Sequence, residues 1–361
     1  MRSKILVIFL LFSMLTACAS NKDKESALLI EKSNTGNYDI VIPYEMSSTR
    51  EYHTQYANSS EDFDTIGSRL LEISKEYFPT NEYVLGEGSV ITYNRLIQLV
   101  GRESDTQEMG LNPRRGENLD IGVKGVEMVN AVLIRDVVEQ DFYKMKDGQA
   151  ELAGISLCVV LNPVQDVVRD GKTTEYTLSD DFLFDYGTMM SRKLDRYMRT
   201  LGESRDVPIL ITLYVNGESG SYVPGYMLGK ALFKDRTPSF ERMNEKWVLF
   251  PSNEATSIDS DNTAQFSTFK SALSEFIEDD VGVVGIAFYE ENTLQKLNIT
   301  VQYTHKTYVE LVSIIQYCST LLETFGNDTF DIMVHFKNQS QTKAIVLKYA
   351  GSQESIVVSM N

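Results

Sequence analysis

The chain has 361 residues, of which 34 are basic and 51 are acidic, for a formal net charge of -17 at pH 7. Such a surface repels phosphate backbones, so the composition excludes nucleic acid from the expected partners. Hydrophobic residues make up 42% and aromatic residues 10%, which is typical of a folded protein with two domains or one large one.

Residues 1–18 contain the parts of a bacterial export signal. A basic start at Arg2 and Lys4 precedes an apolar run over residues 5–12, which is too short to span a bilayer. Small residues then lead to a cysteine in Leu15-Thr16-Ala17-Cys18. We predict a signal peptide over residues 1–17, cleavage after Ala17 and lipidation of Cys18. A plain signal peptide with an incidental cysteine is the alternative, although residues 15–17 supply only part of an Ala-x-Ala site.

Acyl chains on Cys18 provide a lasting attachment, because each buried methylene adds about 0.8 kcal/mol. No later apolar run approaches the roughly 20 residues of a membrane-spanning helix. Residues 18–37 are polar and poor in aromatics, which is typical of a flexible tether. The predicted partner is therefore a lipid bilayer, and the predicted location is the extracytoplasmic face of the cell membrane.

Residues 38–138 are predicted to form an N-terminal α+β region. A helix is expected over residues 61–78, with Ser59 and Asp62 near its start and Pro79 after its end. Its apolar positions recur at three- and four-residue spacings: Phe63, Ile66, Leu70, Ile73 and Tyr77. The elements expected next are a strand (82–85), a short helix (93–100), a polar loop (101–118) and a helix marked by Val126, Val129, Leu133 and Val137.

From residue 139 onward the same order of elements occurs twice. The first unit, residues 139–240, has a predicted hairpin turning at Asp147-Gly148, followed by a strand, a helix and two strands. The elements after the turn are expected over residues 155–161, 182–201, 209–215 and 227–233. The second unit, residues 241–361, begins with a linking helix. Its helix and later elements are expected over residues 266–277, 281–289, 297–303, 308–325, 331–336 and 344–349.

Two glycines, Gly202 and Gly326, stop the main helices of these units at equivalent points, as glycine does just past a helix end. The predicted fold class is α+β: two tandem β-β-α-β-β units with mainly antiparallel sheets, preceded by the smaller helix-containing N-terminal region. Chance similarity within an α+β protein is the competing interpretation, because residue identity between the units is low.

The first unit differs from the second in two long loops. Residues 162–181 precede its helix, and residues 216–226 form a Gly- and Tyr-rich excursion in its closing hairpin. Long loops on a rigid scaffold are either functional or merely tolerated, and both interpretations stay open. If the excursion is functional, the candidate ligand residues are Tyr222, Pro224, Gly225 and Tyr226.

The sequence contains no motif that demonstrates catalysis, a metal site or a cofactor. His53, His305 and His335 lack metal-ligand spacing. Arg114 and Arg115 form a basic spot in an acidic chain and are candidate anion contacts, with an ordinary surface pair as the alternative. We therefore expect a protein that is not an enzyme and that has no catalytic residues and no cofactor.

Two cysteines remain beyond residue 18, Cys158 and Cys318. Each lies in an apolar run, where a buried small hydrophobe is the simplest interpretation. The sequence leaves open whether the two are joined.

Taken together, these features resemble the CamS-type sex pheromone lipoproteins of Gram-positive bacteria over nearly the whole mature chain. The resemblance rests on short motifs in a characteristic order and spacing. Besides the cysteine-containing signal, these are Gly110-Leu111-Asn112-Pro113, Leu152-Ala153-Gly154-Ile155-Ser156, Leu161-Asn162, Val207-Pro208-Ile209, Leu213-Tyr214 and Val223-Pro224-Gly225. The resemblance implies that the excised signal is trimmed to a short peptide, here residues 11–17, which enterococci sense as a mating pheromone. It implies no catalytic residues.

Three hypotheses for the folded body follow. The first is a membrane-anchored extracytoplasmic lipoprotein that is not an enzyme and that binds a ligand or a cell-envelope partner through the loops of the first unit. The alternative is a hydrolase of envelope polymers, which requires two carboxylates within about 10 Å in one cleft. The third is a carrier whose only selected product is the signal fragment.

Overall fold

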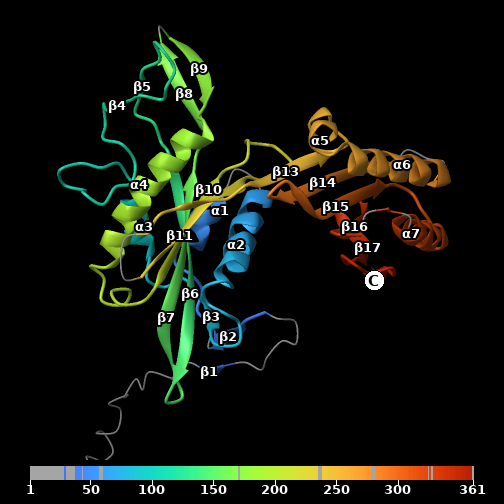
Figure 1. Cartoon of the computed structure of the whole chain (residues 1–361), viewed down its shortest axis with the longest axis horizontal. Helices are drawn as coiled ribbons and strands as arrows, with labels where there is room; N and C mark the ends of the chain where they lie inside the picture. Colours follow the sequence, from blue (N-terminus) through green and yellow to red (C-terminus); the bar gives the residue numbers. More distant parts are fainter. Residues whose placement is uncertain are drawn as a thin grey trace, which may run out of the picture.

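The computed structural model describes residues 28–29, 37–42, 44–56, 60–169, 171–234, 238–277, 281–323, 325–326 and 328–359. Its two large sheets and their helices confirm the mixed α+β class (Figure 1). The predicted cleavage and lipidation residues, Ala17 and Cys18, lie outside the described residues. None of the described helices combines the length and apolar character needed to cross a membrane.

The first sheet has eight strands and includes segments from both sides of residue 139. In spatial order its strands are β1 (Leu28–Leu29), β2 (Asp39–Ile42), β3 (Val84–Glu87), β6 (Ile134–Lys146), β7 (Gln149–Leu161), β10 (Ile209–Val215), β11 (Tyr226–Phe233) and β12 (Glu241–Arg242). The pairs β2–β3 and β7–β10 are parallel, and the other neighbouring pairs are antiparallel. The predicted hairpin turn is confirmed, with Asp147 and Gly148 both at positive φ between β6 and β7.

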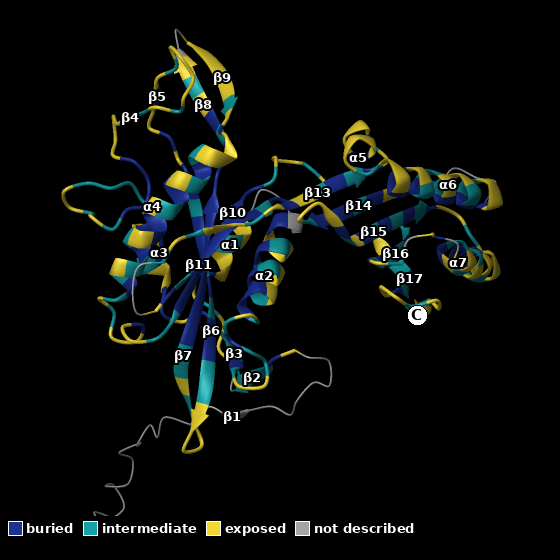
Figure 2. Cartoon of the chain, in the orientation of Figure 1, coloured by how far each residue is buried: buried dark blue, intermediate teal, exposed yellow. Residues whose placement is uncertain are grey.

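Helices cover both faces of this sheet (Figure 1). They are α1 (Arg50–Tyr56), α2 (Ser60–Ser74), α3 (Tyr93–Leu99) and α4 (Asp180–Met198). Strand β10 is buried on both sides: Ile211 and Leu213 belong to the core beneath α4, whereas Leu210 and Tyr214 belong to the core beneath α2. Figure 2 shows this burial along the middle of the sheet, with the tip of the β6–β7 hairpin exposed.

Two segments differ from the sequence-based expectation. The helix predicted around residues 126–137 is wrong, because the chain there forms β5 (Met128–Val129), paired with β4 (Asn118–Leu119), and then enters β6. Its apolar residues have helical spacing, but Gly122 and Gly125 just before them adopt positive φ, which interrupts a helix. The predicted loop 162–181 contains a ribbon of β8 (Val164–Arg169) and β9 (Lys172–Thr177).

The second sheet has six strands, β13 (Glu245–Phe250), β14 (Gly282–Glu290), β15 (Thr293–Tyr303), β16 (Asp331–Asn338), β17 (Gln341–Lys348) and β18 (Ile356–Ser359). Its helices are α5 (Asn253–Ile258), α6 (Ser260–Ile277) and α7 (Tyr308–Glu323). Strands β14 to β17 pair antiparallel, parallel and antiparallel in turn, which is the pairing order of β6, β7, β10 and β11. Alternate residues of β15, such as Leu297, Ile299 and Val301, enter the core shared with α6 and α7.

An ion-pair cluster joins the two sheets through α2. The Arg69 guanidinium binds the carboxylate of Glu245 on β13, contacts Glu290 on β14 at 3.2 Å, and lies 4.8 Å from the centre of the Phe288 ring. The second oxygen of Glu245 accepts a hydrogen bond from the backbone N–H of Met227 in the first sheet. Helix α2 therefore connects the two halves of the protein while it also forms one side of the pocket described next.

Candidate functional site

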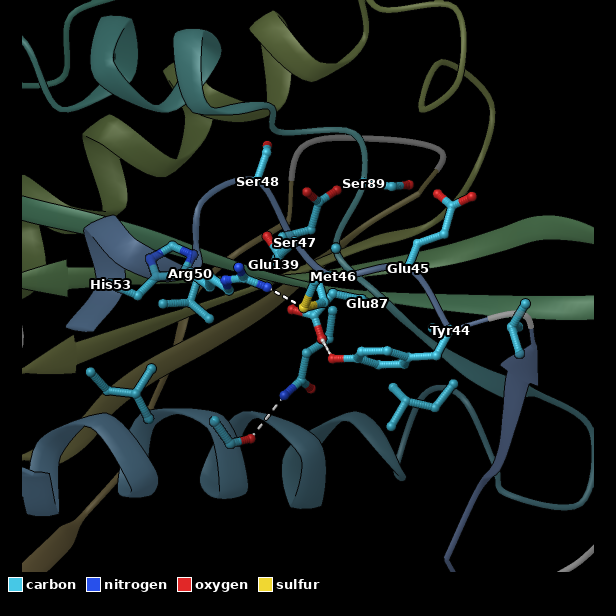
Figure 3. A pocket seen from close by; sticks show the side chains of 18 of the residues that line it. Tyr44, Glu45, Met46, Ser47, Ser48, Arg50, His53, Glu87, Ser89 and Glu139 are labelled. Atoms are coloured by element: carbon cyan, nitrogen blue, oxygen red, sulfur yellow. Dashed lines mark hydrogen bonds between the residues drawn. The ribbon is translucent and has the colours of Figure 1, made fainter. Parts of the chain in front are cut away.

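A pocket of about 760 Å³ lies on the α2 side of the first sheet. Its walls come from residues 40–41 and 44–56, from the first turns of α2, from residues 85–89 and from β6. Figure 3 shows α2 along one side, with His53 and Arg50 entering from α1 and Tyr44 reaching across towards Glu87. The volume falls within the roughly 300–1,000 Å³ that is usual for small-molecule sites.

Two glycines bring the chain close to β6 at the back of this pocket. A Cβ at Gly86 would lie 2.5 Å from the Tyr143 ring, and one at Gly88 would lie 2.7 Å from Glu139. Side chains at these two positions are therefore incompatible with the observed approach. The Gly86-Glu87-Gly88 sequence serves packing here, and it places the next three backbone N–H groups beside two carboxyl groups.

Those carboxyl groups belong to Glu139 and Asp141, which share a face of β6 because side chains alternate along a strand. The two oxygens of Glu139 accept hydrogen bonds from the backbone N–H groups of Val90 (3.2 Å) and Ile91 (2.7 Å). Asp141 Oδ2 accepts from the backbone N–H (3.0 Å) and the hydroxyl (2.8 Å) of Ser89. The pair thus holds the turn over residues 88–91 against the sheet.

The same two carboxyl groups are almost fully buried and touch each other. Burial, reinforced by the Asp141 carboxylate, raises the pKa of Glu139 well above its usual range. Burial also raises the pKa of Asp141, to about 6, against the opposing effect of the Ser89 donors. Asp141 Oδ1 has no hydrogen-bond donor within the described structure, and a proton on Glu139 would supply one.

A third buried carboxylate pairs with a histidine at the α1 end of the pocket. His53 Nδ1 lies 2.7 Å from Asp136 Oδ2, and Asp136 Oδ1 accepts from the backbone N–H of Val137. The neighbouring Tyr52 hydroxyl donates to the carbonyl of Arg135 at a register shift in β6. These contacts hold α1 against β6. His53, for which the sequence indicated no role, therefore has a structural partner in Asp136.

The rim of the pocket is apolar and exposed. Tyr44, Met46, Tyr56 and Phe63 line it with 62%, 66%, 42% and 40% of their surfaces exposed. The Tyr44 hydroxyl lies 3.4 Å from Glu87 Oε2, and the negative charge of Glu87 raises the pKa of this phenol. Large apolar groups left exposed together are typical of a binding surface.

The candidate ligand loop is only partly available to a ligand. Tyr222 is 78% exposed, but Pro224 and Gly225 are buried and the Tyr226 hydroxyl donates to Asp180 at 2.6 Å. Asp62 anchors the loop. Its Oδ1 accepts from the backbone N–H groups of Gly217 (3.1 Å) and Gly225 (2.7 Å) and from the Tyr214 hydroxyl. None of the four candidate loop residues lines the 760 Å³ pocket.

The candidate anion contacts lie elsewhere in the fold. Arg114 pairs with Asp105 at 2.6 Å and with Glu103 at 3.1 Å, and these partners raise the pKa of its exposed guanidinium. Arg115 is exposed in the same loop. Neither arginine lines the pocket, so the structure does not bring the two groups of candidate residues into one site.

Other chemistry-bearing groups are dispersed. Within the described residues, no three His, Cys, Asp or Glu side chains are arranged to hold a metal ion. Cys158 and Cys318 are free and buried in separate cores. Burial raises the pKa of both thiols, that of Cys158 to about 12. A smaller pocket of about 370 Å³ lies beside α7 and includes Lys306 and Lys343.

The sequence analysis missed the carboxylates on β6, although a signal was present. In Val137-Val138-Glu139-Gln140-Asp141-Phe142, two acids recur at alternate positions beside three large apolar residues. Alternation places both acids on one face. That the face is buried could not be read from the strand, because residues 88–91 from a distant part of the chain cover it, whereas α2 lies against the opposite face at Gln140.

Comparisons with known proteins agree with this architecture. A family model described as the CamS sex pheromone cAM373 precursor matches residues 44–354. The structure is similar to a sex pheromone precursor from Lactobacillus salivarius subsp. salivarius, with a TM-score of 0.82 and 22% identity, covering 93% of this chain and 99% of that one. It is also similar to the C-terminal domain of the sex pheromone staph-cAM373 precursor from Staphylococcus aureus, with a TM-score of 0.69 and 21% identity, covering 85% and 99%. No curated protein matches the chain.

Proposed function

The chain belongs to the CamS family of sex pheromone cAM373 precursors, and from this premise we propose a lipid-anchored extracytoplasmic protein whose folded body binds a small ligand. The observation that carries the binding role is the pocket of about 760 Å³ with exposed Tyr44, Met46, Tyr56 and Phe63 at its rim. This site replaces the 216–226 excursion as the proposed ligand contact, because Asp62 and Asp180 already hold most of that loop.

The proposed anchor rests on Leu15-Thr16-Ala17-Cys18. Cys18→Ala should abolish metabolic labelling with a fatty-acid analogue and leave the precursor uncleaved at Ala17. Cys158→Ala is the matched control, because its thiol is buried and should be inaccessible to lipidation. Labelling that persists in Cys18→Ala would refute the anchor.

The excised signal peptide is the proposed source of a pheromone, with residues 11–17 as the fragment. A synthetic peptide of this sequence should induce the mating response in an enterococcal strain that senses cAM373-type peptides. A scrambled peptide is the control, and an inactive native sequence would contradict the proposal.

If the fragment were the only selected product, deletion of residues 38–361 would cause no growth or envelope defect.

We propose a binding role in preference to envelope-polymer hydrolysis. Glu139 and Asp136 both line the pocket, but their oxygens already accept hydrogen bonds from backbone N–H groups or contact His53. A general acid or base must instead reach the substrate atom to which it transfers a proton. The Glu139→Gln variant should therefore still bind a ligand of the pocket. Loss of a hydrolytic activity in this variant would favour the hydrolase hypothesis.

Blocking the pocket tests the binding role directly. Gly67 on α2 lines the pocket, and a Cβ there would meet no atom within 4 Å, so Gly67→Phe can fill the space without a backbone clash. Gly202→Phe is the matched control, since Gly202 also has open space but lies outside the pocket.

Three probes of similar shape suit this test: phenylbutylamine, phenylbutanol and phenylbutyrate, which are cationic, neutral and anionic near neutral pH. Saturation-transfer NMR with the purified full chain should detect binding of at least one probe. Binding should disappear in Gly67→Phe and persist in Gly202→Phe. The absence of binding by all three, or equal binding by both variants, would refute the pocket.

We further propose that the two halves are copies of one β-β-α-β-β unit. Support comes from the shared pairing order, in which β7–β10 and β15–β16 are the central parallel pairs, each flanked by antiparallel neighbours. Helix α4 connects the first parallel pair and α7 the second. Superposition of residues 139–240 on residues 241–361 should align these pairs and helices together, and misplaced helices would contradict a common unit.

A further inference from the structure

The charges lining the pocket are unbalanced. Glu45, Asp64 and Glu87 contribute three exposed carboxylates, whereas Arg50 contributes one exposed guanidinium, which leaves an excess of two negative charges. No ion pair to Glu45 or Asp64 occurs among the described residues. Arg50 lies at the rim, where its guanidinium contacts the sulfur of Met46.

The remaining ionisable groups of the pocket do not reverse this balance. His53 and Asp136 form a pair that is neutral when the ring is protonated and negative when it is not. Glu139 is an acid, so in either protonation state it adds no positive charge to the pocket. An anionic ligand would therefore meet net repulsion at the rim.

The apolar rim adds a second, independent preference. Tyr44, Tyr56 and Phe63 are exposed around the same opening, and aromatic faces attract cations as well as apolar groups. Tyr56 stacks on Tyr52 with ring centres 4.2 Å apart, which holds its ring in place. The thioether of Met46 supplies an adaptable apolar contact beside these rings.

We infer that the pocket binds an organic cation. The ligand class is an amine whose ammonium group is attached to an aromatic or aliphatic group. This inference rests on the proposed ligand-binding role of the same pocket. The carboxylates of Asp64 and Glu87 face the ammonium group, and the Tyr44, Tyr56 and Phe63 side chains contact the apolar body. The net charge of -17 on the whole chain steers cations towards the protein.

The test compares the affinities of the three probes for the full chain by isothermal titration calorimetry. Phenylbutylamine should bind about tenfold more tightly than phenylbutanol, and phenylbutyrate should bind most weakly. Asp64→Asn and Glu87→Gln should each weaken amine binding by about three- to fivefold and leave binding of the alcohol unchanged. Glu254→Gln is the matched control, because this exposed glutamate on α5 lies outside the pocket.

The outcomes separate this inference from the proposed function. Equal affinity for amine and alcohol, or tightest binding of the carboxylate, would overturn the cation preference and leave the ligand pocket standing. An amine preference that survives both carboxylate substitutions would overturn the assignment to Asp64 and Glu87. If no probe binds, the cation inference and the pocket fail together.

Discussion

The Tyr214 hydroxyl lies 2.7 Å from Asp62 Oδ1, a hydrogen bond that joins β10 to the first turn of α2 across 152 residues of sequence. The same carboxylate oxygen accepts the backbone N–H groups of Gly217 and Gly225. The excursion between β10 and β11 is therefore attached to the helix that forms one wall of the pocket.

Tyr214→Phe should lower the free energy of unfolding by about 1.5–3 kcal/mol, because it removes a buried hydrogen bond to a carboxylate. Urea unfolding measures the change. Tyr222→Phe, in the same excursion but exposed, should leave the free energy within about 0.5 kcal/mol of the wild type. Equal effects of the two substitutions would contradict the anchoring role of Asp62.

Gly225 should tolerate no side chain. Its Cβ would lie 1.9 Å from the carbonyl oxygen of Val215, so Gly225→Ala must displace the backbone and should cost about 3 kcal/mol or more. Gly67→Ala should instead raise stability by up to about 1 kcal/mol, because it replaces glycine within a helix where space is open. Thermal unfolding of both variants checks the opposite signs.

Removal of the Arg69 guanidinium should weaken the junction between the sheets. Arg69→Met leaves the buried Glu245 on β13 without its cation, and loss of one partner from a buried pair costs about 3–5 kcal/mol. Burial already raises the pKa of Glu245, so this cost should shrink as pH falls and the carboxyl group protonates.

The control for this junction is Lys246→Met, which breaks an exposed pair with Glu254 and should change stability by less than about 1 kcal/mol. Denaturant unfolding at several pH values provides the comparison. A cost of Arg69→Met that grows as pH falls would contradict the assignment of Glu245 as the unpaired charge.

Glu139 and Asp141 should make stability fall as pH rises. The pKa of each carboxyl group is raised in the folded protein, that of Asp141 to about 6, so the native state binds more protons than the unfolded chain above about pH 4. Their stabilisation is complete below the unfolded pKa values and is lost as pH rises through the folded ones, by roughly 1–3 kcal/mol.

The effect of this pair is measured as a difference between variants. Glu139→Gln keeps a donor for Asp141 and should flatten this part of the stability curve between about pH 4 and pH 7. Glu151→Gln, an exposed substitution on the neighbouring strand, should keep the slope of the wild type. A wild-type slope retained in Glu139→Gln would show that the pair does not share a proton.

Much of the local structure was predictable from the sequence. Strand β10 occupies the predicted residues 209–215, and α4 covers most of the predicted 182–201 helix. Ile66, Leu70 and Ile73 of the predicted first helix are buried on one side of α2. The helices were predictable because their apolar positions recur over several turns, and β10 because its residues form a nearly unbroken apolar run. Helical spacing misled at residues 126–137, where Val129 belongs to β5, Val137 belongs to β6, and Gly125 just before them adopts positive φ.

The sequence by itself determined the acidic character, the α+β class and the positions of most elements, because each depends on composition or on residues close together in the chain. Only the tertiary structure decided which of the many carboxylates are buried. Asp136 meets His53 across 83 residues, and Glu139 meets the N–H groups of residues 90–91 across almost 50. The pocket arises where α1, α2 and the 88–91 turn pack around β6, and no local pattern specifies that packing.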